Sequence, residues 1–348
     1  IENGMGAKWK WLAKMFAFFG AGVGLLGIGT FTQVNGISSA VCNFFDPDKV
    51  NTIALFGRDY SIATIIAGLA LTVCVGLVVI GGLKRIASVS QVVVPFMAII
   101  YFVFAFIVIV THITALPAAI VAIIKSAFTG SALAGGAAGT MVVAMQKGIA
   151  RGIFSNEAGL GSAPIAAAAA QTHSTVRQGL VSMTGTFIDT IVICTMTGLT
   201  IVITGTWNTG LEGVAITTAA FQKGLPFPPA VASLVLMVCL VFFAFTTILG
   251  WNYYGERCIE YLFNRNKKVV KGYRWLYILA IFIGPYMTVE AVWNIADIFN
   301  ALMAFPNLIA LIALSPVVFA ETKAFFGKQK AKVKSAEVQA NKSEAKRS

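Results

Sequence analysis

A short polar, glycine-containing segment interrupts an apolar stretch, residues 134–171, that otherwise favours helix. Polar side chains and glycines favour exposed backbone over continuous helix. In hydrocarbon, unwound backbone persists only inside protein or beside a watery cavity, where its N–H and C=O groups become available to a ligand. Helix N-termini suit a carboxylate, whereas helix C-termini and unwound carbonyls suit a sodium ion or an ammonium group. The segment therefore predicts a broken membrane-spanning helix that binds a zwitterion and a cation, and its polar residues and glycines are Ser155, Asn156, Glu157, Gly159 and Gly161.

The flanks of this segment both read as helix. Residues 140–153 precede it, and on its far side Pro164 fits a first helical turn with Ser162 as the N-cap. A simpler interpretation is that the glycines form a kink that only lets the helix pack closely against its neighbours. That interpretation leaves the clustered polar residues unexplained, because polar groups are rare at membrane depth without a function.

The residues of this segment, GIARGIFSNEAGLGSAPIAAAAA, resemble the signature of the sodium:alanine (alanine or glycine:cation) symporter family. The segments GIGTFTQVN and TTILGWNYYGER extend the resemblance over essentially the whole chain. The resemblance implies a leucine-transporter-type fold of inverted repeats. It also implies sodium-coupled symport of a small neutral amino acid, alanine or glycine, by alternating access, with sodium as the coupling ion and no other cofactor. The family's first spans, including a Gly-Thr-Gly-Asn broken helix, have no counterpart here, so we expect an N-terminally truncated sequence.

The same resemblance assigns roles to residues in three parts of the chain. Gln33 is expected to contact the amino acid from the first span, although a glutamine there also fits a structural hydrogen bond between helices. The adjacent Thr246 and Thr247 are expected to contribute to a sodium site, although threonines in membrane helices often bond to carbonyls of their own helix. The substrate-binding residues expected on this basis are Gln33, Gly29, Ile153, Phe154, Ser155, Asn156, Gly159 and Gly161, and the sodium-binding residues are Thr246 and Thr247.

The composition is that of a polytopic membrane protein. Of the 348 residues, 57% are hydrophobic and only 11% are charged, and the mean hydropathy is +0.82. The net charge of +12 comes from short loops and the C-terminal tail, which indicates membrane topology and excludes a nucleic-acid surface. The five cysteines form no CxxC pair and there are only two histidines, so we expect neither a disulfide framework nor a zinc or haem centre.

We expect about eight spans, one or two of them discontinuous, because an even number keeps the basic C-terminal tail on the same side as the other basic loops. Residues 116–128 are expected to form a helix on the membrane surface, and residues 206–228 an external lid with a helical middle. Residues 1–327 would form the transporter domain in the inner (plasma) membrane, and residues 328–348 a basic, disordered cytoplasmic tail. The expected spans cover residues 12–41, 61–82, 86–113, 134–171, 176–205, 229–263, 275–289 and 291–326, the last broken or bent at Phe305 and Pro306.

Ionisable residues within the spans are costly and are therefore candidates for function. Asp189 fits a cation ligand, a proton-exchanging group or an ion-pair partner of Arg151, and we favour the last. Lys147 and Arg151 fit the wall of a vestibule, a snorkelling position at the interface, or a pair with an acid such as Glu157.

Three other functions compete with sodium symport. A proton-coupled amino-acid transporter and an amino-acid-permeable channel remain alternatives, although one broken helix among small-residue helices fits an occluding site better than a pore. An intramembrane serine protease would need Ser162 and His173, but His173 follows the span in a basic loop, out of reach of a serine at membrane depth. We therefore do not expect an enzyme.

Overall fold

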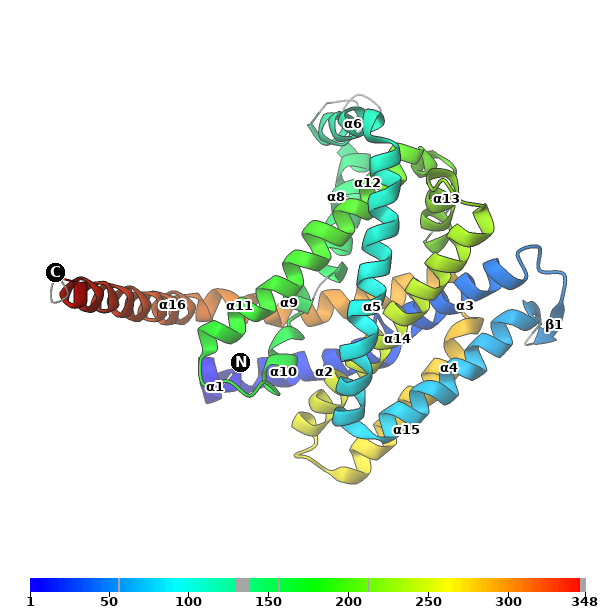
Figure 1. Ribbon diagram of the computed structural model, residues 1–348. Coiled ribbons are helices and arrows are strands. Elements are labelled where there is room, and N and C mark those ends of the chain that lie inside the picture. The colour runs from blue at the N-terminus through cyan, green and yellow to red at the C-terminus, as the bar shows by residue number, and fades with distance from the viewer. Residues whose placement is uncertain (56, 129–137, 156, 212, 345–348) are drawn as a thin grey trace.

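The computed structural model describes the whole chain except residues 56, 129–137, 156, 212 and 345–348, and it is helical almost throughout (Figure 1). In the described part, six helical segments are long and apolar enough to cross a membrane. The prediction of an all-α polytopic membrane protein is therefore confirmed, with one small hairpin of antiparallel strands as an addition. The six segments are Ala7–Phe45, Ile62–Ile80, Gly82–Thr111, Thr175–Thr204, Pro229–Leu262 and Val289–Ala331.

The elements follow one another in this order. In the first half of the chain they are α1 (Glu2–Met5), η1 (Ala7–Trp9), α2 (Lys10–Leu26), α3 (Phe31–Phe45), β1 (Thr52–Leu55), β2 (Arg58–Ser61), α4 (Ile62–Ile80), α5 (Gly82–Thr111), η2 (Ile113–Ala115), α6 (Leu116–Phe128), α8 (Ala138–Ser155), α9 (Glu157–Leu160) and α10 (Ala163–Ala167). In the second half they are α11 (Thr175–Thr186), the π-helix η3 (Phe187–Cys194), α12 (Thr195–Thr204), η4 (Thr206–Asn208), α13 (Val214–Gly224), α14 (Pro229–Leu262), α15 (Lys267–Ile283), η5 (Gly284–Tyr286) and α16 (Val289–Glu344).

Two of the eight expected spans are not among the six long segments. One is the broken span, which consists of α8, α9 and α10, and the other is α15, which has 17 residues. Helix α15 begins at Lys267, several residues before the expected start, because the Asn266 side chain accepts a hydrogen bond from the Lys268 amide at 3.0 Å and caps the helix. The basic residues that we assigned to a loop therefore form the first turns of a helix.

Helices occur in both segments predicted to lie between the spans. Helix α6 covers Leu116–Phe128, and α13 lies in the middle of residues 206–228. Their positions on the membrane surface and over the site stay predictions. At the other end of the chain, α16 is continuous through Pro306 and Pro316, so the break expected at Phe305 and Pro306 is not found. The expected domain boundary after residue 327 falls within α16, and it stays a prediction.

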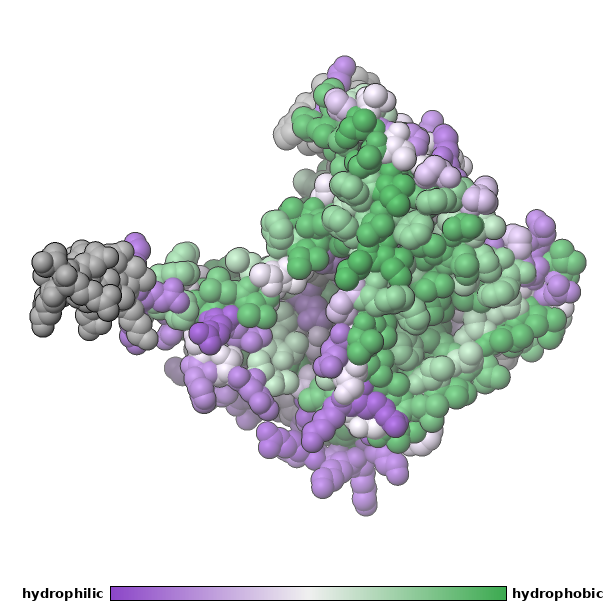
Figure 2. All heavy atoms as spheres, in the orientation of Figure 1, coloured by the Kyte–Doolittle hydropathy of each residue, from purple (hydrophilic) through white to green (hydrophobic). Residues whose placement is uncertain are grey.

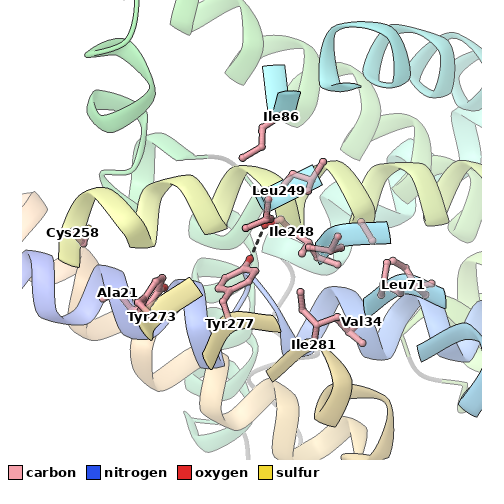
Figure 3. Close-up of a cluster of buried hydrophobic side chains, with 14 of the residues drawn as sticks. Ala21, Val34, Leu71, Ile86, Ile248, Leu249, Cys258, Tyr273, Tyr277 and Ile281 are labelled. Atoms are coloured by element: carbon pink, nitrogen blue, oxygen red, sulfur yellow. Dashed lines mark hydrogen bonds between the residues drawn. The ribbon is translucent and has the colours of Figure 1, made fainter. Parts of the chain in front are cut away.

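Helix α14 is the centre of the packing. It contacts α2, α3, α5, α13 and α15, and α16 packs along α2. In the largest core cluster, Ile248 and Leu249 of α14 meet Tyr277 and Ile281 of α15 and Val34 of α3 (Figure 3). The described core thus gathers segments that are far apart in the sequence around one long helix.

Small residues let α2 approach its neighbours closely. A Cβ atom at Gly20 would lie 2.8 Å from the Cys258 sulfur on α14, and one at Gly22 would overlap the Phe299 ring on α16. Since lipid tails are as apolar as side chains, such close contact stabilises helix pairs in a membrane more than hydrophobic burial does. The outer surface is broadly apolar, and hydrophilic residues gather at the end that carries the turn between α14 and α15 (Figure 2).

Candidate functional site: two broken helices packed on α14

The first span is broken, which we did not predict. Helix α2 ends at Leu26 and α3 begins at Phe31, and the Gly27 and Gly29 amides both donate to the Val23 carbonyl, at 3.0 and 3.2 Å. A Cβ atom at Gly29 would lie 2.6 Å from both the Gly24 carbonyl oxygen and the Trp251 Cβ. Only glycine fits this close approach of the break to α14.

Tyrosines of α15 bind backbone carbonyls of this region. The Tyr277 hydroxyl lies 2.8 Å from the Gly29 carbonyl oxygen and 2.6 Å from that of Ile248 on α14 (Figure 3). One turn earlier, the Tyr273 hydroxyl donates to the Ala21 carbonyl at 2.9 Å. A break in a membrane helix persists only if its polar backbone groups find such partners.

The second break is the predicted one. Helices α8 (to Ser155) and α9 (Glu157–Leu160) lie on either side of Asn156, which is outside the described residues, and the described helix ends at Leu160, before Gly161, Ser162 and the start of α10. Gly161 has a φ of +86°, in the left-handed region that favours glycine. Ser162 precedes α10 as expected, but its hydroxyl donates to the Glu157 carbonyl at 3.5 Å and makes no cap hydrogen bond.

Asn307 of α16 holds this second break in place. Its amide nitrogen donates to the carbonyl oxygens of Ala158 and Gly159, at 3.4 and 3.3 Å. A Cβ atom added at Gly161 would lie 2.5 Å from the Asn307 Cγ. The glycine therefore fits closely against a neighbouring side chain, in addition to any role that it has in binding.

The two breaks meet beside α14. Leu160, from the second break, belongs to one buried cluster with Ile28, from the first break, and with Trp251 and Tyr254 of α14. The Tyr254 hydroxyl donates to the Glu157 carboxylate at 2.6 Å. The structure thus brings Gly29, Gly159 and Gly161 into one region, where unwound carbonyls and helix ends from two spans lie close together.

Ionisable residues around α8 have partners that differ from the predicted ones. Arg151 forms an ion pair with Asp297 of α16, and its guanidinium lies 4.3 Å from the centre of the Trp293 ring. The pairing of Arg151 with Asp189 that we favoured is therefore wrong, since Asp297 neutralises Arg151 from a helix far away in the sequence. Asp189 instead accepts a hydrogen bond from the Ser155 hydroxyl at 2.6 Å.

The other predicted site residues are placed as follows. Gln33 is half-buried on α3 and makes no hydrogen bond within the described part of the chain. Ile153 and Phe154 belong to the last turn of α8, and Asn156 lies outside the described residues. Thr246 is buried on α14 and donates to the Phe242 and Phe243 carbonyls, and Thr247 donates to Phe243 at 3.0 Å.

Three residues of this region were not predicted: Tyr277, Tyr254 and Asn307. An asparagine directly after a proline, inside an apolar span, is a signal that could have indicated Asn307, because intramembrane amides usually have a specific partner. The two tyrosines carry no such signal, because tyrosines in apolar segments are equally typical of the membrane interface.

A polytopic helical membrane protein with broken helices meeting in its interior has the architecture of a membrane transporter, since binding sites in transporters form at such breaks. The chain belongs to the sodium:alanine symporter family, whose model matches residues 1–340. This confirms the family predicted from the sequence, and the family consists of transporters and not of enzymes.

Relatives with high identity support the same assignment. An uncharacterized transporter of Haemophilus influenzae is 50% identical over 332 residues, which are 95% of this chain and 68% of that protein. The sodium/alanine symporter AgcS of Methanococcus maripaludis is 43% identical over 328 residues, 93% of this chain and 66% of that protein. The probable sodium/glutamine symporter GlnT of Bacillus subtilis is 39% identical over 289 residues, 82% of this chain and 59% of that protein. This chain thus spans about two thirds or less of the length of these relatives.

Proposed function

We propose that this protein is a sodium-coupled symporter of a small neutral amino acid, alanine or glycine, that works by alternating access in a leucine-transporter-type fold. The observation that carries the proposal is the meeting of the two breaks beside α14, at the cluster of Ile28, Leu160 and Trp251. Breaks of this kind offer a carboxylate the N-terminal end of one half-helix, and offer cations the unwound carbonyls and C-terminal ends of others. An amino acid and a sodium ion together require both.

Within this proposal the substrate contacts backbone and side chains of both breaks. Gly29, Gly159 and Gly161 leave the backbone of the breaks without side chains, and Ser155 adds a hydroxyl group. We also assign Ile153, Phe154 and Asn156 to the substrate on the resemblance of their sequence segment to the family, and Gln33 of α3 for the same reason. Thr246 and Thr247 bind the sodium ion through the oxygen lone pairs that remain after their hydroxyl hydrogens bond to the helix.

The names of the relatives support a sodium-coupled carrier, but they differ in the amino acid that they name. The Methanococcus relative is named for alanine and the Bacillus relative for glutamine. We propose the smaller substrates, alanine or glycine, because the family is named for alanine. We also place the protein in the plasma membrane with its C-terminus in the cytoplasm, since the basic turn between α14 and α15 and the basic tail then lie on the same side.

The experiment is uptake of radiolabelled alanine into proteoliposomes that contain the purified protein. An inward sodium gradient should drive alanine above its equilibrium concentration, and excess unlabelled glycine should compete better than glutamine. Accumulation driven by a pH gradient in sodium-free buffer would support the proton-coupled alternative. If alanine only reaches equal concentrations on both sides, with a sodium gradient and with a pH gradient, the result would support the alternative of an amino-acid-permeable channel.

A further inference from the structure

A cavity of about 500 Å³ lies between α3, α5, α14 and α16, with η3, α12 and the start of α13 also contributing to its wall. We call it the α3–α14 cavity. None of the residues proposed above for the substrate or for sodium lines it. Among the described lining residues, Asp189 carries the only ionisable carboxylate or cationic side chain. Aliphatic and aromatic residues such as Leu236, Phe243 and Trp293 make up much of the remaining wall.

Asp189 has hydrogen-bond donors but no basic partner among the described residues. Its carboxylate accepts hydrogen bonds from Ser155 at 2.6 Å and from Thr190 at 3.5 Å, both on the same oxygen. Within the described part of the chain, Asp189 forms no salt bridge with a basic side chain. A carboxylate that no described basic residue pairs with therefore lies at the wall of the cavity.

Such a position favours a positively charged ligand, because an isolated carboxylate at membrane depth is costly. A sodium ion alone does not account for the cavity, whose volume lies in the range of pockets for organic ligands and whose wall is largely apolar. An ammonium group on a small organic molecule accounts for both features. Ser39 and Asn43, elsewhere in the same wall, offer polar hydrogens that suit the carboxylate of an amino acid.

We propose that the α3–α14 cavity is a second amino-acid site, in which Asp189, held by Ser155, binds the ammonium group of the transported amino acid. This inference rests on the proposed function, because the ligand is the transported amino acid. A charged hydrogen bond of this kind makes Asp189 a determinant of specificity for ligands that carry an ammonium group.

The test compares alanine with lactate, which has a hydroxyl group where alanine has the ammonium group. Binding of each is measured by isothermal titration at saturating sodium, for the wild-type protein and for Asp189→Asn, which keeps the shape and an acceptor for Ser155. Asp189→Asn should weaken alanine binding about 10- to 100-fold, as expected for loss of a charged hydrogen bond, and should leave the weak binding of lactate unchanged. Glu290→Gln, which removes an exposed carboxylate from the start of α16, is the matched control and should bind alanine as the wild type does.

Other outcomes would overturn the inference. Alanine affinity unchanged in Asp189→Asn would show that the carboxylate does not bind the ligand. If Asp189→Asn weakens sodium binding measured without alanine, Asp189 is a sodium ligand instead. If Asp189→Asn leaves the alanine affinity unchanged but removes its pH dependence, Asp189 is a proton site instead. If Asp189→Asn does not fold, Asp189→Ser, which removes the charge and keeps a small polar group, carries the test with the same expectation for alanine. An alanine affinity that is unchanged in Asp189→Ser would overturn the inference. A wild-type protein that does not bind alanine would instead refute the proposed function itself.

Discussion

The hydroxyl group of Tyr277 on α15 lies 2.8 Å from the carbonyl oxygen of Gly29, in the break between α2 and α3. The same hydroxyl lies 2.6 Å from the Ile248 carbonyl of α14. Tyr277 is completely buried, so no solvent can replace it as a partner for either oxygen. One side chain thus connects a broken helix to the central helix of the fold.

Tyr277→Phe should therefore destabilise the protein while keeping the shape of the core. Removing the hydroxyl leaves a buried carbonyl without its donor, which costs about 1–3 kcal/mol. Thermal denaturation in detergent should show a lower melting temperature. Tyr253→Phe is the control, since the Tyr253 hydroxyl makes no hydrogen bond in the described part of the chain, and it should melt near the wild-type temperature. Equal melting of all three proteins would show that the Tyr277 hydroxyl does not support the break.

Gly161→Ala should destabilise the second break even in the absence of substrate. The added methyl group would crowd Asn307 at 2.5 Å, and crowding in a packed site costs about 1–3 kcal/mol. Gly152→Ala on α8 is the matched control, because nothing lies within 4 Å of its added Cβ atom. It should be neutral or slightly stabilising, by about 0.5–1 kcal/mol.

A double variant separates side-chain crowding from backbone strain at this glycine. Gly161→Ala should lower the melting temperature less in an Asn307→Ala background than in the wild-type background. The reason is that the Asn307 side chain, which the added methyl group would crowd, is then absent. The same fall in both backgrounds would mean that Asn307 is not what restricts the position, and that the left-handed backbone alone does.

The predicted second break and the unpredicted first break differ in what the sequence shows. Ser155 and Glu157 lie beside Gly159 and Gly161, and polar residues together with glycines indicate a break. Gly27 and Gly29 continue the series Gly20, Gly22 and Gly24, and the polar residues that follow them, Thr30, Thr32 and Gln33, also fit a continuous helix. The earlier glycines stay helical in α2 and allow close packing. What breaks the helix at Gly27–Thr30 is tertiary: the Tyr277 hydroxyl binds the freed carbonyl, and Trp251 occupies the space where a side chain would be.

The ion pair of Arg151 could not be assigned from the sequence for a similar reason. Asp189, Glu157 and Asp297 all lie within apolar segments and are chemically equivalent partners. The choice among them depends on α16 lying beside α8, a long-range contact that local patterns do not encode. The positions of most spans, by contrast, follow from hydropathy, and six of the eight expected spans match the long apolar helices of the described chain.

Thr247→Ala should weaken the apparent affinity for sodium and leave the affinity for alanine at saturating sodium unchanged. The hydroxyl oxygen of Thr247 keeps a lone pair for a cation after its hydrogen bonds to Phe243. The sodium dependence of alanine uptake measures this affinity. Thr247→Ser, which keeps the hydroxyl group, should have the sodium affinity of the wild type. Thr72→Ala on α4 is the control, because Thr72 makes the same type of bond to its own helix, at 2.7 Å to Gly68. A change in alanine affinity with unaltered sodium dependence would contradict the assignment.

Asp46 should make the hairpin β1–β2 sensitive to acid. The Ser61 hydroxyl donates to its carboxylate at 2.5 Å and the Val50 amide at 2.9 Å, and the Ser61 hydrogen bond lowers the pKa of Asp46 below its ordinary value of 3.8. Because the folded pKa is the lower one, the stabilisation is present above pH 3.8 and is lost as the pH falls through the folded value.

Hydrogen exchange at the Val50 amide measures this effect, with faster exchange expected on acidification after correction for the intrinsic rate. Asp46→Asn should exchange faster than the wild type at neutral pH and should lose the pH dependence. Asp48→Asn, at an exposed position of the same loop, should behave as the wild type. Protection of Val50 that is independent of pH in the wild type would refute the role of the Asp46 carboxylate.

The central claim is that one amino acid and sodium bind together where the two broken helices meet, and that they cross the membrane together. Influx of radioactive sodium into proteoliposomes, measured with and without external alanine, tests it most directly. Because coupling is reciprocal, alanine should accelerate sodium influx just as sodium accelerates alanine uptake. Gly29→Ala, whose Cβ atom would lie 2.6 Å from the Gly24 carbonyl oxygen and distort the first break, should abolish both effects while leaving the liposomes tight. Sodium influx that is indifferent to alanine, in a preparation that still takes up alanine, would contradict the account.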